Sequence, residues 1–342
     1  MRSKYERRVL GSVGVLARRP THPASDIERH WMRDSKRTYI LPRRATRGRV
    51  ARRSGRPRNP MHAICHDSEF DNHTLRAMKR PLMATAAHKR IVLKFGSGIL
   101  ATPRGTNLDQ RQFARLAKEV AVLVSCGHEV IIVSSGAVAA GLGALGLKNR
   151  PEDLASRQAC AAVGQGRLMS CYTDHFAKHD VTVAQLLLTH RDMDSRTSYA
   201  NIRNTVGRLL ANHVVPIVNE NDTVAVEELK FGDNDSLSAA VAILSDANLL
   251  ILLTSVDGLL DAKGRTIPRV DDLDSVTKFV RQEKGRLSVG GMSTKLQAVR
   301  AAVSAGIPTV VASGRKAGQI VRAASGRPAG TYFPPLVPLN AQ

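Results

Sequence analysis

The sequence predicts an α/β fold with a mainly parallel central sheet that carries helices on both faces. Two observations predict it: apolar strands alternate with amphipathic helices from His88 onward, and several of the strands are apolar throughout. A strand that is buried on both faces of a sheet reads as a continuous apolar run, and an intervening helix returns the chain for parallel pairing. We find no internal repeat.

The first half of this region alternates regularly between the two kinds of element. Asn107 is the candidate N-cap of the first long helix, and Gly127 is its candidate stop signal. We expect strands at 90–95, 129–133 and 181–188, and helices at 108–127, 154–177 and 196–211.

The second half repeats the alternation around two polar loops. Asp235 is expected to open a helix that runs through Ile243, and a hairpin is expected at 257–268 around Lys263 and Gly264. We expect further strands at 214–219, 247–254 and 308–313, and a further helix at 292–306.

The net charge of +22 is concentrated before the predicted fold. Residues 1–88 hold 21 Lys/Arg and 7 Asp/Glu, whereas residues 89–342 hold 30 and 22. We therefore expect a basic, disordered N-terminal extension at 1–85, a folded domain at 86–335 and a short tail at 336–342. Aromatic residues are only 4% of the chain, too few for base-stacking platforms, so nucleic acid is not an expected partner of the domain.

Three interpretations of the extension stay open: an organelle presequence, a nucleic-acid-binding tail, and an extension with no role in the chemistry. The four cysteines show neither a C-x-x-C pair nor a histidine partner at zinc spacing, so we expect reduced packing residues and a cytoplasmic protein, with organelle targeting as the alternative. No apolar run approaches the length that spans a bilayer, so no membrane association is expected.

Two lysines stand beside glycine-rich loops of the kind that bind phosphate. Lys94 precedes the turn Gly96–Gly98, and Lys295 lies one turn into the helix that follows Gly290 and Gly291. Exposed backbone amides at a helix start, together with an ammonium group, favour phosphate binding. The pattern G-x-x-x-x-G-K-[ST] is absent, so a phosphate site here must have another construction.

The block at 219–239 supplies the opposite chemistry. Carboxylates and amides gather in NEND at 219–222 and again in DND at 233–235. Such groups suit an ammonium ion, a divalent cation or a lysine side chain. A third candidate, GLGALG at 141–146, matches the dinucleotide pattern but does not directly follow its strand, so we interpret it as part of a helix and turn.

In combination and order, these motifs resemble the amino acid kinase family, and within it the members that phosphorylate the γ-carboxylate of L-glutamate. The motifs are K-F-G-S-G, V-S-S-G-A-V-A-A-G, A-A-V-G-Q-G-R-L, N-E-N-D-T-V-A, F-G-D-N-D-S-L-S-A and G-G-M-S-T-K. The resemblance covers residues 90–333. It implies a three-layer αβα sandwich and the first reaction of proline biosynthesis, in which ATP, with Mg²⁺, and L-glutamate give ADP and L-glutamyl 5-phosphate. The alternative is a family member that acts on another acylated amino acid or on a small phosphate.

The resemblance also implies residue roles. Lys94, Lys295 and Asp235 would be catalytic, with Asp235 orienting the two lysines. Ser135, Asp222 and Asn234 would bind glutamate. The ATP-binding residues would be Lys94, Thr254, Ser255, Val289, Gly290, Gly291, Met292, Ser293, Thr294 and Lys295.

Two departures from the family pattern accompany these roles. Many members have T-D where this chain has Thr254–Ser255, and many carry a C-terminal RNA-modification-type (PUA) domain that we do not expect after GTYFPP at 330–335. The family further implies a homo-oligomer and feedback inhibition by proline.

Overall fold

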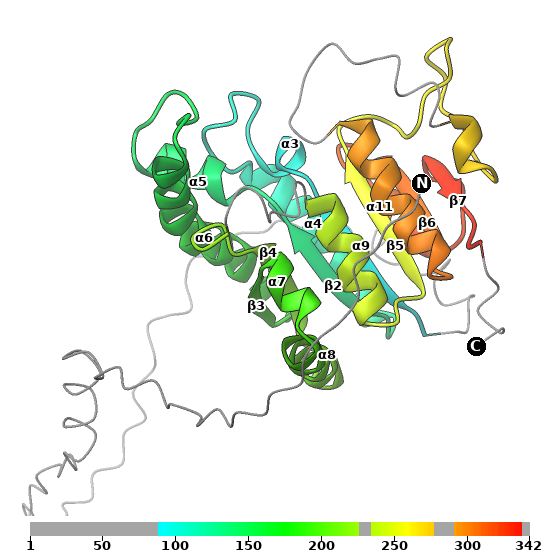
Figure 1. Ribbon diagram of the computed structural model, residues 1–342, viewed down its shortest axis with the longest axis horizontal. Helices are drawn as coiled ribbons and strands as arrows, with labels where there is room; N and C mark the ends of the chain where they lie inside the picture. The colour runs from blue at the N-terminus through cyan, green and yellow to red at the C-terminus, as the bar shows by residue number, and fades with distance from the viewer. Residues whose placement is uncertain (1–87, 226–233, 277–290, 337–342) are drawn as a thin grey trace, which may run out of the picture. The chain divides into compact units, whose positions relative to one another are not determined.

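The computed structural model describes residues 88–225, 234–276 and 291–336. The basic segment at 1–85 and nearly all of the tail at 336–342 lie outside the described residues. Figure 1 shows a central sheet with helices in front of it and behind it. The predicted α/β sandwich, with its mainly parallel sheet, is confirmed.

The sheet has seven strands in the order β3-β4-β2-β1-β5-β6-β7. All neighbouring pairs are parallel except β6 and β7, which are antiparallel. The strands are β1 Arg90–Phe95, β2 Glu129–Ser134, β3 Val183–Leu188, β4 Val215–Glu220, β5 Leu249–Thr254, β6 Thr309–Ser313 and β7 Thr331–Phe333.

Nine described helices accompany these strands, and two of them match their predicted bounds, α6 and α8. The helices are α3 Ser97–Leu100, α4 Gln110–Ser125, α5 Ala137–Ala144, α6 Leu154–Ala177, α7 His190–Asp194, α8 Arg196–Ala211, α9 Asn234–Leu244, α11 Met292–Ser304 and α12 Gln319–Ala324. Four elements were not predicted: α3, α7, α12 and β7.

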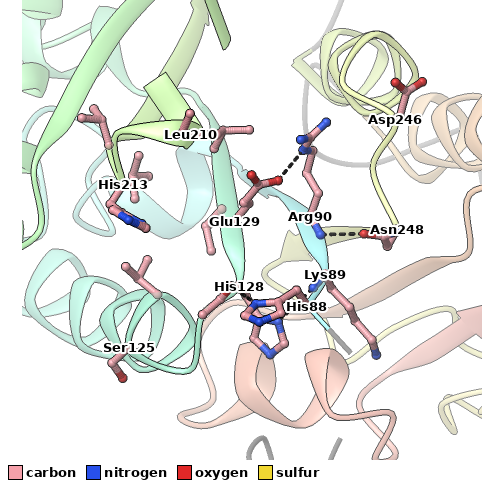
Figure 2. Close-up of a pocket in the computed structure, with 16 residues that line it drawn as sticks. His88, Lys89, Arg90, Ser125, His128, Glu129, Leu210, His213, Asp246 and Asn248 are labelled. Carbon is pink, nitrogen blue, oxygen red and sulfur yellow. Dashed lines mark hydrogen bonds and ion pairs between the residues drawn. The ribbon is translucent and has the colours of Figure 1, made fainter. Parts of the chain in front are cut away.

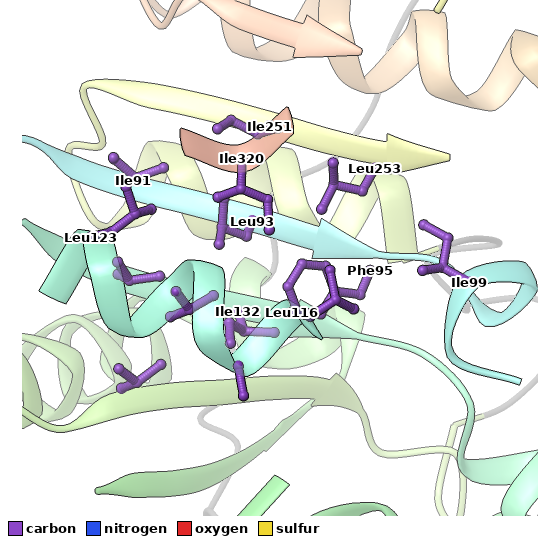
Figure 3. Packing of buried hydrophobic residues seen from close by; sticks show 14 of the residues in the cluster. Ile91, Leu93, Phe95, Ile99, Leu116, Leu123, Ile132, Ile251, Leu253 and Ile320 are labelled. Carbon is purple, nitrogen blue, oxygen red and sulfur yellow. The ribbon is translucent and has the colours of Figure 1, made fainter. Parts of the chain in front are cut away.

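Two apolar cores lie on opposite faces of the sheet. On one face, Leu93 and its alternate neighbours in β1 pack against α4, α6 and α12 (Figure 3). On the other face, Val92 packs into a cluster with α8, α9 and α11. Because β1 faces a helix layer on each side, alternation between apolar and polar residues is absent from it and five of its six residues are buried.

The first long helix begins later than the sequence suggested. Asp109, not Asn107, is the N-cap of α4, and its carboxylate accepts hydrogen bonds from the backbone N–H groups of Arg111 and Gln112. Asn107 is engaged in the preceding loop, where its carbonyl accepts from Thr102 N–H. The predicted N-cap was therefore wrong because local loop pairing competes with helix initiation there.

The GLGALG segment lies in α5 and the turn after it, as interpreted from the sequence. A Cβ atom added at Gly141 would lie 1.9 Å from the carbonyl oxygen of Cys160 in α6, and one added at Gly164 of α6 would lie 1.7 Å from the carbonyl oxygen of Ala137. The glycines therefore permit α5 and α6 to pack backbone against backbone. The structure also shows an antiparallel bridge between Leu260 and Thr266 at the predicted hairpin.

Candidate functional site

The candidate site lies at the carboxyl edge of the sheet. Because β1, β2, β4 and β5 are parallel neighbours, their last residues share this edge. Lys94 is the penultimate residue of β1, Ser135 follows β2, and Thr254 ends β5. The start of α9 reaches the same place, since Asn234 contacts the end of β2. The topology thus gathers motifs that are far apart in the sequence.

Asp235 pairs with both predicted lysines. Lys94 Nζ lies 2.6 Å from Asp235 Oδ1, and Lys295 Nζ lies 2.9 Å from Asp235 Oδ2. Asp235 is completely buried, and the two lysine residues are 3% and 9% exposed. One carboxylate therefore fixes the ammonium groups of two lysines from different elements. Lys94 comes from the end of β1, and Lys295 comes from the first turn of α11.

The electrostatics of this trio favour its charged form. Burial disfavours the ionised carboxylate, but the ammonium groups of Lys94 and Lys295 outweigh that penalty and lower the pKa of Asp235 below its ordinary value. Two cations share one anion, so the trio carries a net charge of about +1 at neutral pH. A buried positive centre of this kind attracts phosphate.

Asn234 binds the end of β2 rather than pointing into solvent. Its Nδ2 lies 2.5 Å from the carbonyl oxygen of Ser134, 2.9 Å from Ser135 Oγ and 2.9 Å from Asn219 Oδ1. The predicted glutamate-binding residues Ser135 and Asn234 are therefore brought into direct contact. Asp222, the third, is half-buried in the turn that follows β4.

The predicted nucleotide residues divide into three groups. Thr254 is buried at the end of β5, and Ser255 is exposed immediately after it. Val289 and Gly290 lie outside the described residues. Apart from Lys94 and Lys295, which pair with Asp235, the others form the N-cap and first turn of α11: Gly291, Met292, Ser293 and Thr294.

The first turn of α11 has a defined backbone arrangement. The carbonyl oxygen of Gly291 accepts hydrogen bonds from Thr294 Oγ1 at 2.9 Å and from the backbone N–H of Lys295. Ser293 is exposed beside it. This turn presents a helix start and the exposed hydroxyl-bearing residue Ser293, two positions before Lys295, an arrangement that suits an anionic ligand.

Two polar residues beneath the site were not predicted as functional. Gln165 and Tyr172 of α6 contact Asn219 and Ser134, respectively. Gln165 belongs to the motif A-A-V-G-Q-G-R-L, which supported the resemblance but received no role. Sequence spacing gives no signal for these contacts, because Asn219 is the penultimate residue of β4 and Ser134 the last residue of β2, and both lie far from α6 along the chain.

A cavity of about 580 Å³ lies at the other end of the strands. His88, His128 and His213 line it, and Figure 2 shows Arg90 bonded there to both Glu129 and Asn248. Since ligands of parallel α/β sheets bind at the carboxyl edge, we assign the site to the Lys94–Asp235–Lys295 edge despite the size of this cavity.

Two features of other protein classes are absent from the described ranges. No group of three or more His, Cys, Asp or Glu side chains is arranged there to hold a metal ion. No described helix combines the length and the apolar character needed to cross a bilayer.

Comparison with known proteins agrees with the geometry of the site. The profile of the Amino acid kinase family matches residues 89–313. The chain is 47% identical over 251 residues to a Glutamate 5-kinase from Thermus thermophilus, covering 72% of this chain and 67% of that protein. It is 46% identical over 254 residues to a Glutamate 5-kinase from Citrifermentans bemidjiense, covering 72% of this chain and 68% of that protein.

Two solved structures share the fold at low sequence identity. UMP kinase from Bacillus anthracis superposes with a TM-score of 0.51 at 18% identity, covering 73% of this chain and 97% of that chain. Carbamate kinase from Giardia superposes with a TM-score of 0.53 at 17% identity, covering 72% of this chain and 99% of that chain. At these identities the likeness shows a common architecture alone.

Proposed function

We propose, from the premise that this chain belongs to the glutamate 5-kinases of the amino acid kinase family, that it transfers the γ-phosphoryl group of ATP to the γ-carboxylate of L-glutamate. The products are ADP and L-glutamyl 5-phosphate, the first step of proline biosynthesis. The observation that carries the proposal is the buried trio in which Asp235 holds Lys94 and Lys295 at the carboxyl edge of the sheet.

The chemistry needs positive charge more than it needs a base. The γ-carboxylate of glutamate is already ionised at neutral pH and is a competent nucleophile. Phosphoryl transfer spreads negative charge over the equatorial oxygens of the transferred group, so catalysis consists of in-line positioning and charge stabilisation. Lys94 would contact the ATP phosphates, and Lys295 would stabilise the group in transfer.

Asp235 would act by positioning the two lysine side chains. Its two oxygens hold the two ammonium groups on separate sides of one carboxylate. The lysines are thereby placed before either substrate arrives, and such preorganised charge costs little rearrangement during the reaction. The transfer would proceed without a covalent enzyme intermediate.

The substrates would lie on either side of the trio. Ser135, Asp222 and Asn234 are proposed to bind L-glutamate, with the Asp222 carboxylate suited to its ammonium group. The residues Thr254, Ser255 and 289–295 are proposed to bind ATP, and Mg²⁺ is proposed to enter with the nucleotide. A homo-oligomer, inhibition by proline and a cytoplasmic location stay predictions, with organelle targeting through residues 1–85 as the alternative.

The proposal is tested by trapping the acyl phosphate. The full chain is incubated with MgATP, hydroxylamine and L-glutamate, and the hydroxamate and the released ADP are both measured. D-glutamate, N-acetyl-L-glutamate and L-aspartate serve as parallel acceptors, and the fragment 86–342 is assayed beside the full chain to examine the role of the extension.

We expect hydroxamate from L-glutamate and little from the other three acceptors. A stronger signal from N-acetyl-L-glutamate would instead support an acylated amino acid as the substrate. No hydroxamate and no acceptor-dependent ADP release with any of these four carboxylates would leave a small phosphate as the alternative substrate.

A further inference from the structure

We propose that α6 is a positioning element of the acceptor site, in which Gln165 and Tyr172 together fix the orientation of the Asn234 side chain. The inference rests on the proposed function, because Asn234 is proposed to bind L-glutamate. Neither α6 residue is among the proposed substrate contacts. They would act through Asn219 and Ser134, respectively, so they are positioning residues.

The two residues lie on one side of their helix. Gln165 and Tyr172 are separated by seven positions, which is about two turns of an α-helix, so their side chains project in similar directions. Tyr172 is buried in the core beneath β2, with its ring edge-on to Phe113. Their helix is held close to the site because α5, which follows Ser135 and Gly136, packs directly on it at Gly164.

The direction of donation is fixed along the chain of hydrogen bonds that joins Ser134, Asn234 and Asn219. The carbonyl oxygen of Ser134 can only accept a hydrogen bond, so the Asn234 atom 2.5 Å from it must be Nδ2. The same Nδ2 faces Asn219 Oδ1, which also accepts from the backbone N–H of Glu220 at 3.0 Å. Two backbone groups therefore determine which way both amides point.

Gln165 completes this chain from α6. With its Oδ1 occupied, Asn219 turns Nδ2 toward Gln165 Oε1 at 2.9 Å. Gln165 Nε2 then donates to Gln185 Oε1 in β3 at 3.0 Å. Asn219 is only 2% exposed, so loss of the Gln165 acceptor would leave a buried amide donor unpaired.

Tyr172 supports the other side of Asn234. The Ser134 hydroxyl donates to the carbonyl oxygen of Ser135 at 3.0 Å, so the Tyr172 hydroxyl, 2.8 Å away, is the donor to Ser134 Oγ. Burial raises the pKa of Tyr172, which keeps this hydroxyl protonated. The bond holds the segment whose carbonyl and hydroxyl oxygens receive Asn234 Nδ2.

The consequence is a defined acceptor at the site. Because Nδ2 is committed to Ser134, Ser135 and Asn219, the carbonyl oxygen of the same planar amide is directed away from them. That oxygen can accept from the free ammonium group of an amino acid, which is charged and has three N–H donors, whereas an N-acylated nitrogen is neutral and has a single N–H to donate. The α6 residues would thus help the site to select a free amino acid.

The test uses three substitutions in α6 and one control substitution, all in the full chain and assayed by hydroxamate formation. In Gln165→Met the acceptor for Asn219 is removed, whereas in Gln165→Glu an acceptor oxygen is retained at the same position. We expect Gln165→Met to raise the KM for L-glutamate by about tenfold, the scale of one unpaired buried group, with kcat within about twofold and the KM for ATP unchanged. Gln165→Glu should restore the KM to within about threefold of the wild-type value.

Tyr172→Phe removes the hydrogen bond from the Tyr172 hydroxyl to Ser134 Oγ and should raise the KM for L-glutamate by about threefold to tenfold. Gln297→Met makes the same side-chain change at an exposed position of α11 and should leave all constants unchanged. Thermal unfolding of each variant is measured in parallel. A role in stability alone would lower the unfolding temperature without a selective rise in the KM for L-glutamate.

Two outcomes would overturn this inference while leaving the proposed function intact. One is an unchanged KM for L-glutamate in Gln165→Met, and the other is equal impairment in Gln165→Met and Gln165→Glu. If the wild-type chain forms no hydroxamate from L-glutamate, the proposed function fails, and this inference fails with it. The two failures are therefore distinguishable from the wild-type assay.

Discussion

Lys94 and Asp235 form a 2.6 Å ion pair in which the side chains are 4% and 0% exposed. Lys94 belongs to a central strand and Asp235 to the first turn of a helix on one face of the sheet. Removal of one partner from so deeply buried an ion pair is costly, and here Asp235 is also the counter-ion of Lys295, which pairs with its second oxygen. The pair is therefore both an element of the proposed chemistry and a point where substitution disturbs the fold.

Lys295→Met should reduce turnover with little effect on glutamate binding. The ammonium group is proposed to stabilise charge that develops during transfer, and loss of one such group lowers kcat by about a hundredfold or more. Steady-state hydroxamate kinetics measure kcat and the KM for L-glutamate. Lys263→Met, an exposed lysine in the 257–268 hairpin, is the matched control. Turnover within a few-fold of wild type in Lys295→Met would remove Lys295 from the mechanism.

Asp235→Asn should destabilise the folded domain strongly. It leaves two ammonium groups close together and buried without an anion, a change that costs about 3–5 kcal/mol. Urea unfolding measures the free energy. Asp246→Asn is the matched control, because Asp246 pairs with Arg203 in an exposed position and should cost less than about 1 kcal/mol. Equal losses of unfolding free energy in the two variants would contradict the role of Asp235 as the buried counter-ion of both lysines.

The stabilising effect of Asp235 should also disappear at low pH. Its pKa is lowered in the folded state, so its contribution is present above the ordinary carboxyl pKa of about 4 and is lost as the pH falls through the lower folded value. The difference in unfolding free energy between wild type and Asp235→Asn should be constant above about pH 5 and shrink below about pH 4. A difference that grows on acidification would contradict the assigned direction of the shift.

Gly164→Ala should separate α6 from α5. The added methyl group would lie 1.7 Å from a backbone oxygen that cannot move alone, so we expect a loss of several kcal/mol, about 3 or more. Gly166→Ala is a control two residues further along the same helix, where a methyl group meets nothing within 4 Å. It should stabilise by up to about 1 kcal/mol, since alanine favours helix. Thermal unfolding of both variants measures these two changes in stability.

The elements with long apolar patterns were predictable from the sequence. Residues 154–177 and 196–211 form helices with those bounds, and the six predicted strands begin and end within two residues of their predicted ends. The helices α3 and α7 have four and five residues, too few to show a periodic pattern. The start of α4 was missed because Asp109 and Asn107 are equally good caps by residue type, and only the preceding loop distinguishes them.

The candidate site was predictable in its composition but not in its connections. Lys94, Asp235 and Lys295 were identified from separate motifs, and parallel pairing explains why they meet. The contact between Asn219 and Gln165 was not predictable, because amide orientation depends on partners from α6 and on backbone groups. Such information appears only when the helices are placed against the sheet.

The position of β1 in the sheet has a consequence for synthesis of the chain. Among the described strands β1 is made first, yet it is paired on one side by β2 and on the other by β5. While the ribosome adds the residues from Ser134 to Thr254, β5 is not yet available to pair with one edge of this strand, whose residues are mostly buried in the fold. At about 5–20 residues per second this interval is on the order of ten seconds. Chaperone contact with the nascent chain should therefore be most valuable between the emergence of β2 and that of β5.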